Sequence, residues 1–355
     1  ATCLTQMNSP AASAITATRS LIDNSVGGAL HRGRWLIISA HNCFVTGDPD
    51  GASRYLSEAR SVAEQSGSSR LSFELGLAFA EHWMRLHDLE RATSELASLE
   101  VSAAKEPAAL RAQFAKMMAR LFLLQERPAE GLRWAEEALR IAQPAGFTGA
   151  NLRAYEIELI YALAANQNLA EAIDLAKQHP SEPRLAIELC LRFLLEGESE
   201  LVLLRDGLQV AARLGFVNLF DRARGVMARI CAAALANDIE PVFVRQVIEL
   251  KQLKPPPLAG ASWPWPVRIF TLGGFRLDIQ GERYRPTHKA QDKPLELLKL
   301  LVTCQAMGRA SSEKGCLAER LWPDAEAENA RKSLDMTLAR LRRLPSHQCR
   351  RLHLA

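Results

Sequence analysis

The residues with the clearest chemical potential are the basic side chains near the C-terminus. Arg331, Lys332, Arg340, Arg342 and Arg343 all fall in the segment 327–344, which predicts a helix. Guanidinium and ammonium groups pair with phosphate oxygens, and an Arg fork can also bind O6 and N7 of a guanine. Residues 266–355 hold 17 Lys and Arg against 10 Asp and Glu, a net charge of +7, while the rest of the chain, with 27 against 30, is −3. This asymmetry favours a surface that faces nucleic acid, with a solvated charged surface as the alternative.

A helical wheel of the segment 327–344 separates its apolar residues from its basic ones. One stripe of small or apolar side chains, which we expect to be buried, consists of Ala330, Leu334, Leu338 and Leu341. The opposite side is mainly basic and holds Lys332, Met336, Arg340 and Arg343, with Arg331 and Arg342 at its borders. The exposed surface of this helix would therefore be cationic, with one apolar patch at Met336.

The elements that must position this helix begin with short strands. Alternating apolar and polar residues predict strands at 267–272 and 275–279 around a Gly273-Gly274 turn, and a third strand at 283–285. Helices are expected at 290–307 and 312–321, the second capped by Ser311 or Ser312 and ended by Pro323. We expect Pro345 to His347 to break the last helix.

This order resembles the winged helix–turn–helix of the OmpR/PhoB type and, more narrowly, that of bacterial transcriptional activators of the antibiotic-regulatory, SARP-like group. Four segments carry the resemblance: V-R-I-F-T-L-G-G-F at 267–275, K-P-L-E-L-L at 293–298, L-W-P-D at 321–324 and L-D-M-T-L-A-R-L-R-R at 334–343. The resemblance implies a regulator whose last helix enters the DNA major groove. At the matching positions it implies DNA contacts from Arg331, Lys332, Met336, Thr337, Arg340, Arg342 and Arg343. For each Arg, the alternative is a solvated surface residue.

Three details qualify this expectation. Thr337 lies nearer the buried stripe than the other six residues, and Asp335 is expected to pair with Arg331, four residues earlier. The SARP-like group places the winged helix before its helical repeats, whereas this chain has the reverse order. Only 12 residues follow Arg343, so we expect the C-terminal hairpin wing to be incomplete.

The larger part of the chain, residues 30–253, predicts helix after helix. Four similar polar turns are each followed by a small residue, Ala52, Ala92, Gly131 and Ala172, at intervals of 40, 39 and 41 residues. A small residue lets two helices of one unit approach closely, and units of this length must stack to bury their apolar faces. The pattern resembles the tetratricopeptide-type superhelix, with a non-repetitive helical domain as the alternative. A solenoid of this kind offers a concave surface to a peptide, a partner domain or a small effector.

A proline-rich linker is expected at 254–266, because Pro255-Pro256-Pro257 and the residues that follow cannot continue a helix. The expected organisation is an N-terminal segment 1–29 of uncertain structure, a helical-repeat domain 30–253, this linker, and a winged-helix domain 267–355. The chain starts with Ala1 instead of Met, which leaves open both a fragment of a longer protein and a complete chain.

No pattern in the sequence predicts catalysis. The sequence lacks a Gly-Lys-Ser/Thr phosphate loop, H-E-x-x-H and G-x-S-x-G, and its seven cysteines form no C-x-x-C pair. His41 and His82 are expected to be packing or surface residues. MalT-like regulators join similar repeats to a DNA-binding end and carry an ATPase domain upstream, which this chain either lacks or has lost with missing sequence. We expect no enzyme activity, no cofactor and no metal.

Taken together, these patterns predict a mostly α protein: a tetratricopeptide-like α-solenoid followed by a small α+β winged helix–turn–helix domain. No secretory signal is visible, and no apolar run reaches the ~18 residues of a membrane span, so a cytoplasmic protein without membrane contact is expected. The predicted function is transcription regulation, with double-stranded DNA on the winged helix, a protein or small-molecule effector on the repeats, and RNA polymerase as a further partner. The alternative is a repeat adaptor that binds proteins through a degenerate winged helix.

Overall fold

The structure, a computed structural model, describes residues 28–45, 48–197, 200–257, 259–279, 281–285, 292–306 and 314–349. The chain divides into two compact units, Ala1–Pro256 and Pro257–Ala355. This division falls within the segment 254–266 that the sequence marks as a linker. The expected N-terminal segment 1–29 lies outside the described residues, apart from its last two.

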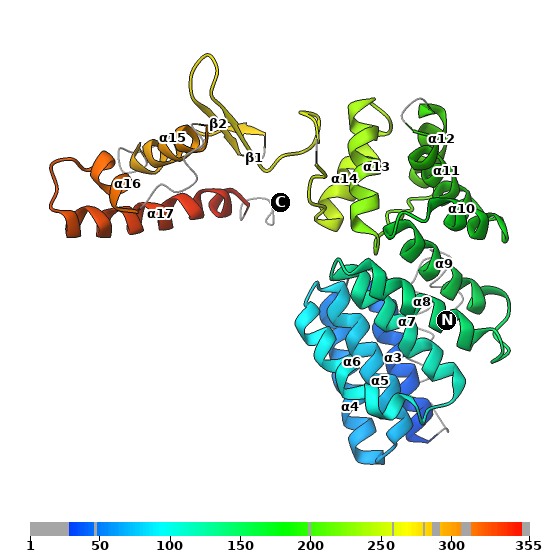
Figure 1. The fold of residues 1–355 in the computed structure, drawn as a ribbon. Coiled ribbons are helices and arrows are strands. Elements are labelled where there is room, and N and C mark those ends of the chain that lie inside the picture. The colour runs from blue at the N-terminus through cyan, green and yellow to red at the C-terminus, as the bar shows by residue number, and fades with distance from the viewer. Residues whose placement is uncertain are drawn as a thin grey trace. The chain divides into compact units, whose positions relative to one another are not determined.

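In the first unit, helices follow one another in hairpin pairs (Figure 1). We call the first helix of each pair the A helix and the second the B helix. The pairs are α3 (Ala29–Val45) and α4 (Pro49–Ser66), α5 (Ser69–Arg85) and α6 (Leu89–Ala103), α7 (Ala108–Leu124) and α8 (Pro128–Ala142), α9 (Gly149–Ala165) and α10 (Leu169–Lys177), α11 (Glu182–Glu196) and α12 (Leu201–Arg213), and α13 (Arg224–Ala236) and α14 (Pro241–Lys251).

The turns that join α5 to α6, α7 to α8 and α9 to α10 share one backbone geometry. In each of these turns one residue takes the left-handed conformation: His87 with φ 60°, Glu126 with φ 61° and Gln167 with φ 64°. The next amide then donates to a carbonyl five residues earlier, Asp88 to Trp83 at 2.9 Å, Arg127 to Phe122 at 2.9 Å and Asn168 to Leu163 at 3.0 Å. This hydrogen bond ends a helix by satisfying one of its last carbonyls. Its recurrence confirms the helical repeat with a period near 40 residues.

The small residues at this period lie where the two helices of a pair meet. Ala52, Ala92 and Ala172 are fully buried in α4, α6 and α10. At Gly131 in α8, an added Cβ would lie 2.8 Å from the Leu123 side chain of α7 and 3.4 Å from the Ala119 carbonyl oxygen. A larger residue at any of these positions would push the helices apart, which explains why only Ala and Gly occur there.

The helix caps allow a first prediction. The Asp88 side chain accepts a hydrogen bond from the Arg91 amide of α6 at 3.1 Å. We expect Asp88→Ala to lower the free energy of unfolding by about 1 kcal/mol, because a helix amide loses its partner, and Asp88→Asn to stay near wild type. Urea denaturation of both variants checks this. Equal losses in the two variants would contradict a capping role. Asp174→Ala, which removes an exposed carboxylate from α10, is the matched control for charge.

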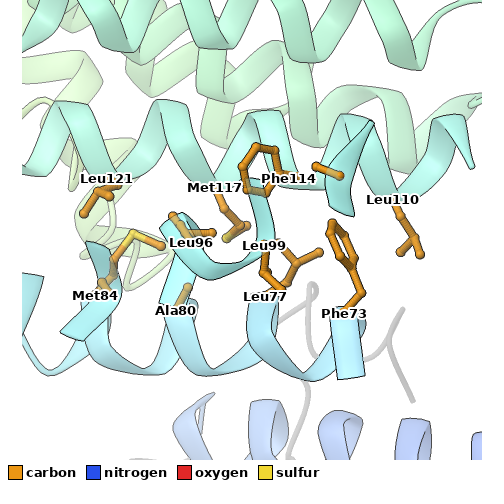
Figure 2. Packing of buried hydrophobic residues seen from close by; sticks show 12 residues of the cluster. Phe73, Leu77, Ala80, Met84, Leu96, Leu99, Leu110, Phe114, Met117 and Leu121 are labelled. Atoms are coloured by element: carbon orange, nitrogen blue, oxygen red, sulfur yellow. The ribbon is translucent and has the colours of Figure 1, made fainter. Parts of the chain in front are cut away.

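The core of the repeats forms between helices of consecutive pairs. Figure 2 shows the cluster between α5, α6 and α7, in which Phe73 and Leu77 of α5 face Phe114 and Met117 of α7, with Leu99 of α6 beside them. From α3 to α9, neighbouring A helices contact one another more extensively than neighbouring B helices do. A stack of hairpins curves toward the side on which its helices lie closest, so α3, α5, α7 and α9 form the inner face of this part of the first unit.

The second unit begins with a three-stranded antiparallel sheet in the order β1-β2-β3. Its strands are β1 (Val267–Phe270), β2 (Arg276–Ile279) and β3 (Glu282–Arg283), each shorter than the sequence predicted. Val267 pairs with Ile279, and the turn between β1 and β2 contains Gly273 and Gly274, both with positive φ. The Arg268 guanidinium donates to the carbonyl oxygens of Ala261 at 2.8 Å and Trp263 at 2.9 Å, which ties the end of the proline-rich segment to β1.

Three helices follow the sheet: α15 (Asp292–Ala306), α16 (Lys314–Leu321) and α17 (Ala327–Cys349). They pack against one another around a core of Leu297, Leu317, Leu321 and Leu334. The prediction that residues 345–347 break the last helix is wrong, since α17 continues past Pro345. A proline removes one backbone hydrogen bond but has a helix-compatible φ, so the helix can continue beyond it. The proposed cap at Ser311 or Ser312 and the final residues 350–355 lie outside the described residues.

Candidate functional site

The apolar stripe of α17 holds this helix against the other two in the second unit. Ala330 and Leu334 are buried in the shared core, and Leu338 and Leu341 pack against its edge. The wheel of the last helix therefore predicted the buried side correctly. This arrangement determines which side chains of α17 remain exposed.

The exposed side of α17 carries most of the predicted DNA-facing residues. Arg331, Lys332, Arg340 and Arg342 are exposed, and the Met336 side chain is 57% exposed. The Arg343 side chain lies outside the described residues. Lys332 pairs with Glu328 of the same helix at 2.8 Å. In the described part of the chain, no carboxylate lies within ion-pair distance of Arg331, Arg340 or Arg342, so these three guanidinium groups are available to an external anion.

Thr337 does not belong to this exposed surface. It is 4% exposed, and its hydroxyl donates to the Ser333 carbonyl oxygen at 2.7 Å within the helix. The wheel position next to the apolar stripe explains this, because a β-branched side chain there is covered by the packed helices. The structure therefore removes Thr337 from the candidate set.

The predicted partner of Asp335 is also wrong. Asp335 pairs with Lys314 of α16 at 3.1 Å instead of with Arg331. The sequence spacing allowed an intrahelical pair, but packing of α16 on α17 brings a second cation within reach. The consequence is that Arg331 has no ion-pair partner among the described residues.

A second basic feature of this unit was missed by the sequence analysis. A cavity of about 320 Å³ lies beside the sheet and α15, and its lining includes Arg276, Arg283, Arg285 and Lys299. Arg276 is engaged, because it pairs with Asp278 at 3.2 Å and stacks over Phe270. The basic residues flanking Tyr284 were a visible signal in the sequence, but only the folded sheet brings them next to Lys299.

The first unit holds a chain of alternating charges that runs over the A helices α5, α7 and α9 and on to the last pair of helices. We call it the charged ladder and define it by Arg85, Glu81, Arg120, Glu158, Arg222, Asp221 and Lys251. Glu81 of α5 pairs with Arg85 at 3.1 Å and with Arg120 of α7 at 3.0 Å. Arg120 also binds Glu158 of α9 with two hydrogen bonds, at 3.0 and 3.3 Å.

The charged ladder continues beyond α9 into the last pair of helices. Glu158 pairs with Arg222 at 2.7 Å, Arg222 with Asp221 at 2.6 Å, and Asp221 with Lys251 of α14 at 3.9 Å. The side chain of Glu158 is only 2% exposed, and that of Arg120 13% exposed. The ladder thus crosses α5, α7, α9 and α14 and is buried at its centre.

The neighbouring charges shift the pKa values of the central groups. Burial alone would raise the pKa of Glu81, but Arg85 and Arg120 hold it well below its ordinary value. Burial would lower the pKa of Arg120, but Glu158 and Glu81 raise it above its ordinary value. Both groups are therefore charged at neutral pH, and the ladder is an ionic structure rather than a set of neutral hydrogen bonds.

Lys116 lies beside the charged ladder, one helical turn before Arg120 on α7. Burial, together with the nearby Arg120, lowers the pKa of its ammonium group to about 8, although Glu81 and Glu158 act in the opposite direction. The ammonium lies 5.1 Å from the ring centre of Tyr155. His41 of α3 is near the same cluster, and burial lowers the pKa of its imidazole. His41, expected to be a packing or surface residue, is thus largely a packing residue, and no sequence pattern singles out Lys116.

Comparison with known proteins found similarity to solved structures only. No protein-family model matches the chain, and no curated protein matches it. The crystal structure of the apo form of RapI is similar over 68% of this chain and 70% of its own, with a TM-score of 0.50 and 14% identity. NprR in complex with its cognate peptide NprX aligns over 89% of this chain and 85% of its own, with a TM-score of 0.43 and 12% identity. The first unit has a helical-repeat fold.

The centre of the charged ladder lies on the inner face of the helical-repeat unit, because Glu81, Arg120 and Glu158 come from the A helices α5, α7 and α9. In the ranges that the structure describes, no group of His, Cys, Asp and Glu has an arrangement that could hold a metal ion. No helix among the described residues is both long and apolar enough to cross a membrane.

Proposed function

We propose that this protein is a cytoplasmic DNA-binding transcription regulator. In this proposal the second unit is a winged helix–turn–helix of the SARP-like type that binds promoter DNA, and the helical-repeat unit binds an effector or partner. The observation that supports DNA binding is the exposed face of α17, where Arg331, Arg340 and Arg342 have no ion-pair partner among the described residues.

The chemistry of this face suits a nucleic acid. Uncompensated guanidinium groups spaced along one helix can each pair with a phosphate, and those that reach base edges can read guanine. Met336, more than half exposed between the basic residues, offers an apolar contact to a thymine methyl. The basic cavity beside the sheet adds Arg283 and Arg285 as further phosphate ligands of the same unit. In this proposal the protein regulates transcription by binding and catalyses no reaction. Contact with RNA polymerase is a further part of the proposal.

The test measures binding of the full chain to labelled genomic double-stranded DNA over a range of salt concentrations. We expect affinity to fall steeply with salt, and the triple variant Arg331→Ala/Arg340→Ala/Arg342→Ala to lower the magnitude of the log–log slope by about 0.9 per lost phosphate contact. The matched control is Arg54→Ala/Arg111→Ala/Arg205→Ala, which removes the same charge from exposed positions of the helical-repeat unit. It should bind like wild type.

Two outcomes would overturn the DNA-binding part of the proposal. One is no salt-dependent binding by wild type, and the other is an equal loss in the two triple variants. Either result would favour the adaptor function, in which the second unit binds proteins. Because every substituted residue is exposed, we expect both triple variants to remain folded. Circular dichroism of each variant checks this.

A further inference from the structure

The charged ladder and Lys116 together carry more positive than negative charge. The charged ladder contains four cations and three carboxylates, and Lys116 beside it is a fifth cation, so these eight groups sum to +2. A cation, Arg85 or Lys251, stands at each end of the ladder. In a partly desolvated setting, such an excess is compensated by an external anion more effectively than by water.

Lys116 is the group in this cluster that the protein itself leaves uncompensated. Among the described residues, no carboxylate lies within ion-pair distance of its ammonium, and no hydrogen bond to it occurs. The charged or titratable groups near it are His41 of α3, Glu81 of α5, Arg120 of its own helix, Tyr155 and Glu158 of α9, and Arg222 before α13. The side chain is partly exposed, so a ligand on the inner face can reach it.

A lysine in this position destabilises the folded chain. Folding lowers its pKa from the ordinary 10.5 to about 8, so the folded state binds fewer protons than the unfolded state between these pH values. Stability therefore rises as pH rises from about 8 to about 10.5, which means that the protonated form opposes folding at neutral pH. Groups retained at the expense of stability are typical of binding sites.

We propose that Lys116 anchors a carboxylate of an acidic peptide that lies across the A helices. This inference rests on the effector-binding part of the proposed function and names the chemistry of that effector. The remaining donors of Arg85 and the imidazole of His41 flank the anchor from α5 and α3. Arg85 is exposed and shares only Glu81 with the ladder, so it can accept a second acidic group.

The extent of the charged ladder favours an extended peptide over a small anion. Packed helices lie about 8–10 Å apart, so cations contributed by α5, α7 and the segments after α9 are spread over several helix widths. A small anion would meet one or two of them. An extended chain advances about 3.3 Å per residue, so a peptide of about eight residues spans three neighbouring helices.

The probe is a fluorescein-labelled peptide of about eight residues, alternating Glu and Gly, titrated with the full chain in fluorescence anisotropy. A Gln–Gly peptide of equal length shows whether binding needs the carboxylates or only the peptide backbone. Inorganic phosphate, added as a competitor, shows whether the site binds any anion. We expect the Glu–Gly peptide to bind, the Gln–Gly peptide not to bind, and phosphate to compete only weakly.

Variants of Lys116 test the anchor itself. We expect Lys116→Met to weaken binding of the Glu–Gly peptide about tenfold or more, the size of one charge-assisted hydrogen bond, and Lys116→Arg to restore it. Lys105→Met, which removes an exposed lysine after α6, is the matched control and should bind like wild type. In the absence of peptide, Lys116→Met should unfold at higher urea concentration than wild type, whereas loss of a structural lysine would shift the transition lower.

The pH dependence provides an independent readout. Because the ammonium has a pKa of about 8, affinity of wild type should fall about tenfold between about pH 7 and about pH 9. Lys116→Arg should bind the Glu–Gly peptide with equal affinity at both pH values, since an Arg remains charged. His41, with a pKa below its ordinary value, is already neutral over this pH range, so it does not contribute to the change in affinity.

The proposal is overturned if the Glu–Gly peptide does not bind, or if Lys116→Met binds it as tightly as wild type does. The triple variant Arg331→Ala/Arg340→Ala/Arg342→Ala should keep full peptide affinity, which excludes binding of the acidic peptide to α17. Failure of the peptide site would leave the DNA measurement untouched, because that assay reports on the second unit. The two proposals therefore fail separately.

Discussion

Replacing Glu158 by Ala is expected to lower the free energy of unfolding by about 3 kcal/mol, at the lower end of the range for breaking one partner of a buried ion pair. Glu158 is buried between Arg120 and Arg222, with ion pairs of 3.0 and 2.7 Å. Its loss leaves two guanidinium groups close together without the carboxylate that separates them. The lower end applies because Arg120 keeps Glu81 and Arg222 keeps Asp221.

Urea denaturation of the full chain, monitored by circular dichroism, measures this effect. The matched control is Glu137→Ala, which breaks an exposed pair with Arg140 and should change stability by less than about 1 kcal/mol. A double-mutant cycle with Arg222→Ala gives the coupling between the two side chains. If Glu158→Ala and Glu137→Ala lose the same small amount, the centre of the charged ladder does not act as a buried ionic structure.

Replacing Phe114 by Ala is expected to lower the free energy of unfolding by about 3–5 kcal/mol, the usual range for a buried aromatic residue. Phe114 is 4% exposed on α7. Its ring lies 6.3 Å from that of Phe73 on α5 and 6.0 Å from that of Trp134 on α8. The ring thus joins two consecutive hairpins, and its loss leaves a cavity between them that neighbouring helices cannot fill without shifting (Figure 2).

The same denaturation experiment on Val101→Ala provides the control, because Val101 of α6 is 84% exposed and should contribute less than about 0.5 kcal/mol. In a repeat protein each unit is stabilised mainly by its neighbours, so Phe114→Ala should also separate the unfolding of α3–α6 from that of the later helices. A single sharp transition with a loss below about 1.5 kcal/mol would contradict the packing role assigned to this ring.

Much of the helical-repeat unit was predictable because its signals are local. Ala52, Ala92, Gly131 and Ala172 recur at nearly constant intervals, and each follows a turn whose backbone is set by a few neighbouring residues. Hydrogen bonds within a helix join residues four apart, so apolar periodicity reports directly on the helix and on its buried side. The stripe of α17 was predictable for the same reason.

Sequence spacing predicted ion pairs less reliably where two cations can reach the same carboxylate. Asp335 and Arg331 have the separation of an intrahelical pair, yet Lys314 from the neighbouring helix binds the carboxylate. Similarly, the wheel placed Thr337 at the border of the buried stripe, and only the packed helices show that it is covered. An exposed ion pair contributes so little free energy that a small change in packing decides which of two partners the charge binds.

The sequence by itself determined that the chain forms a helical repeat, where its hairpins turn, and which side of the last helix is buried and which is basic. The tertiary structure alone decided that Glu81, Arg120, Glu158 and Arg222 meet, and that Lys116 stands among them without a carboxylate of its own. Arg120 lies 38 or 39 residues from each of its partners. Contact between residues so far apart in the sequence depends on how each hairpin is rotated against the next. That rotation results from many packed side chains together, so the spacing of neighbouring residues does not predict it.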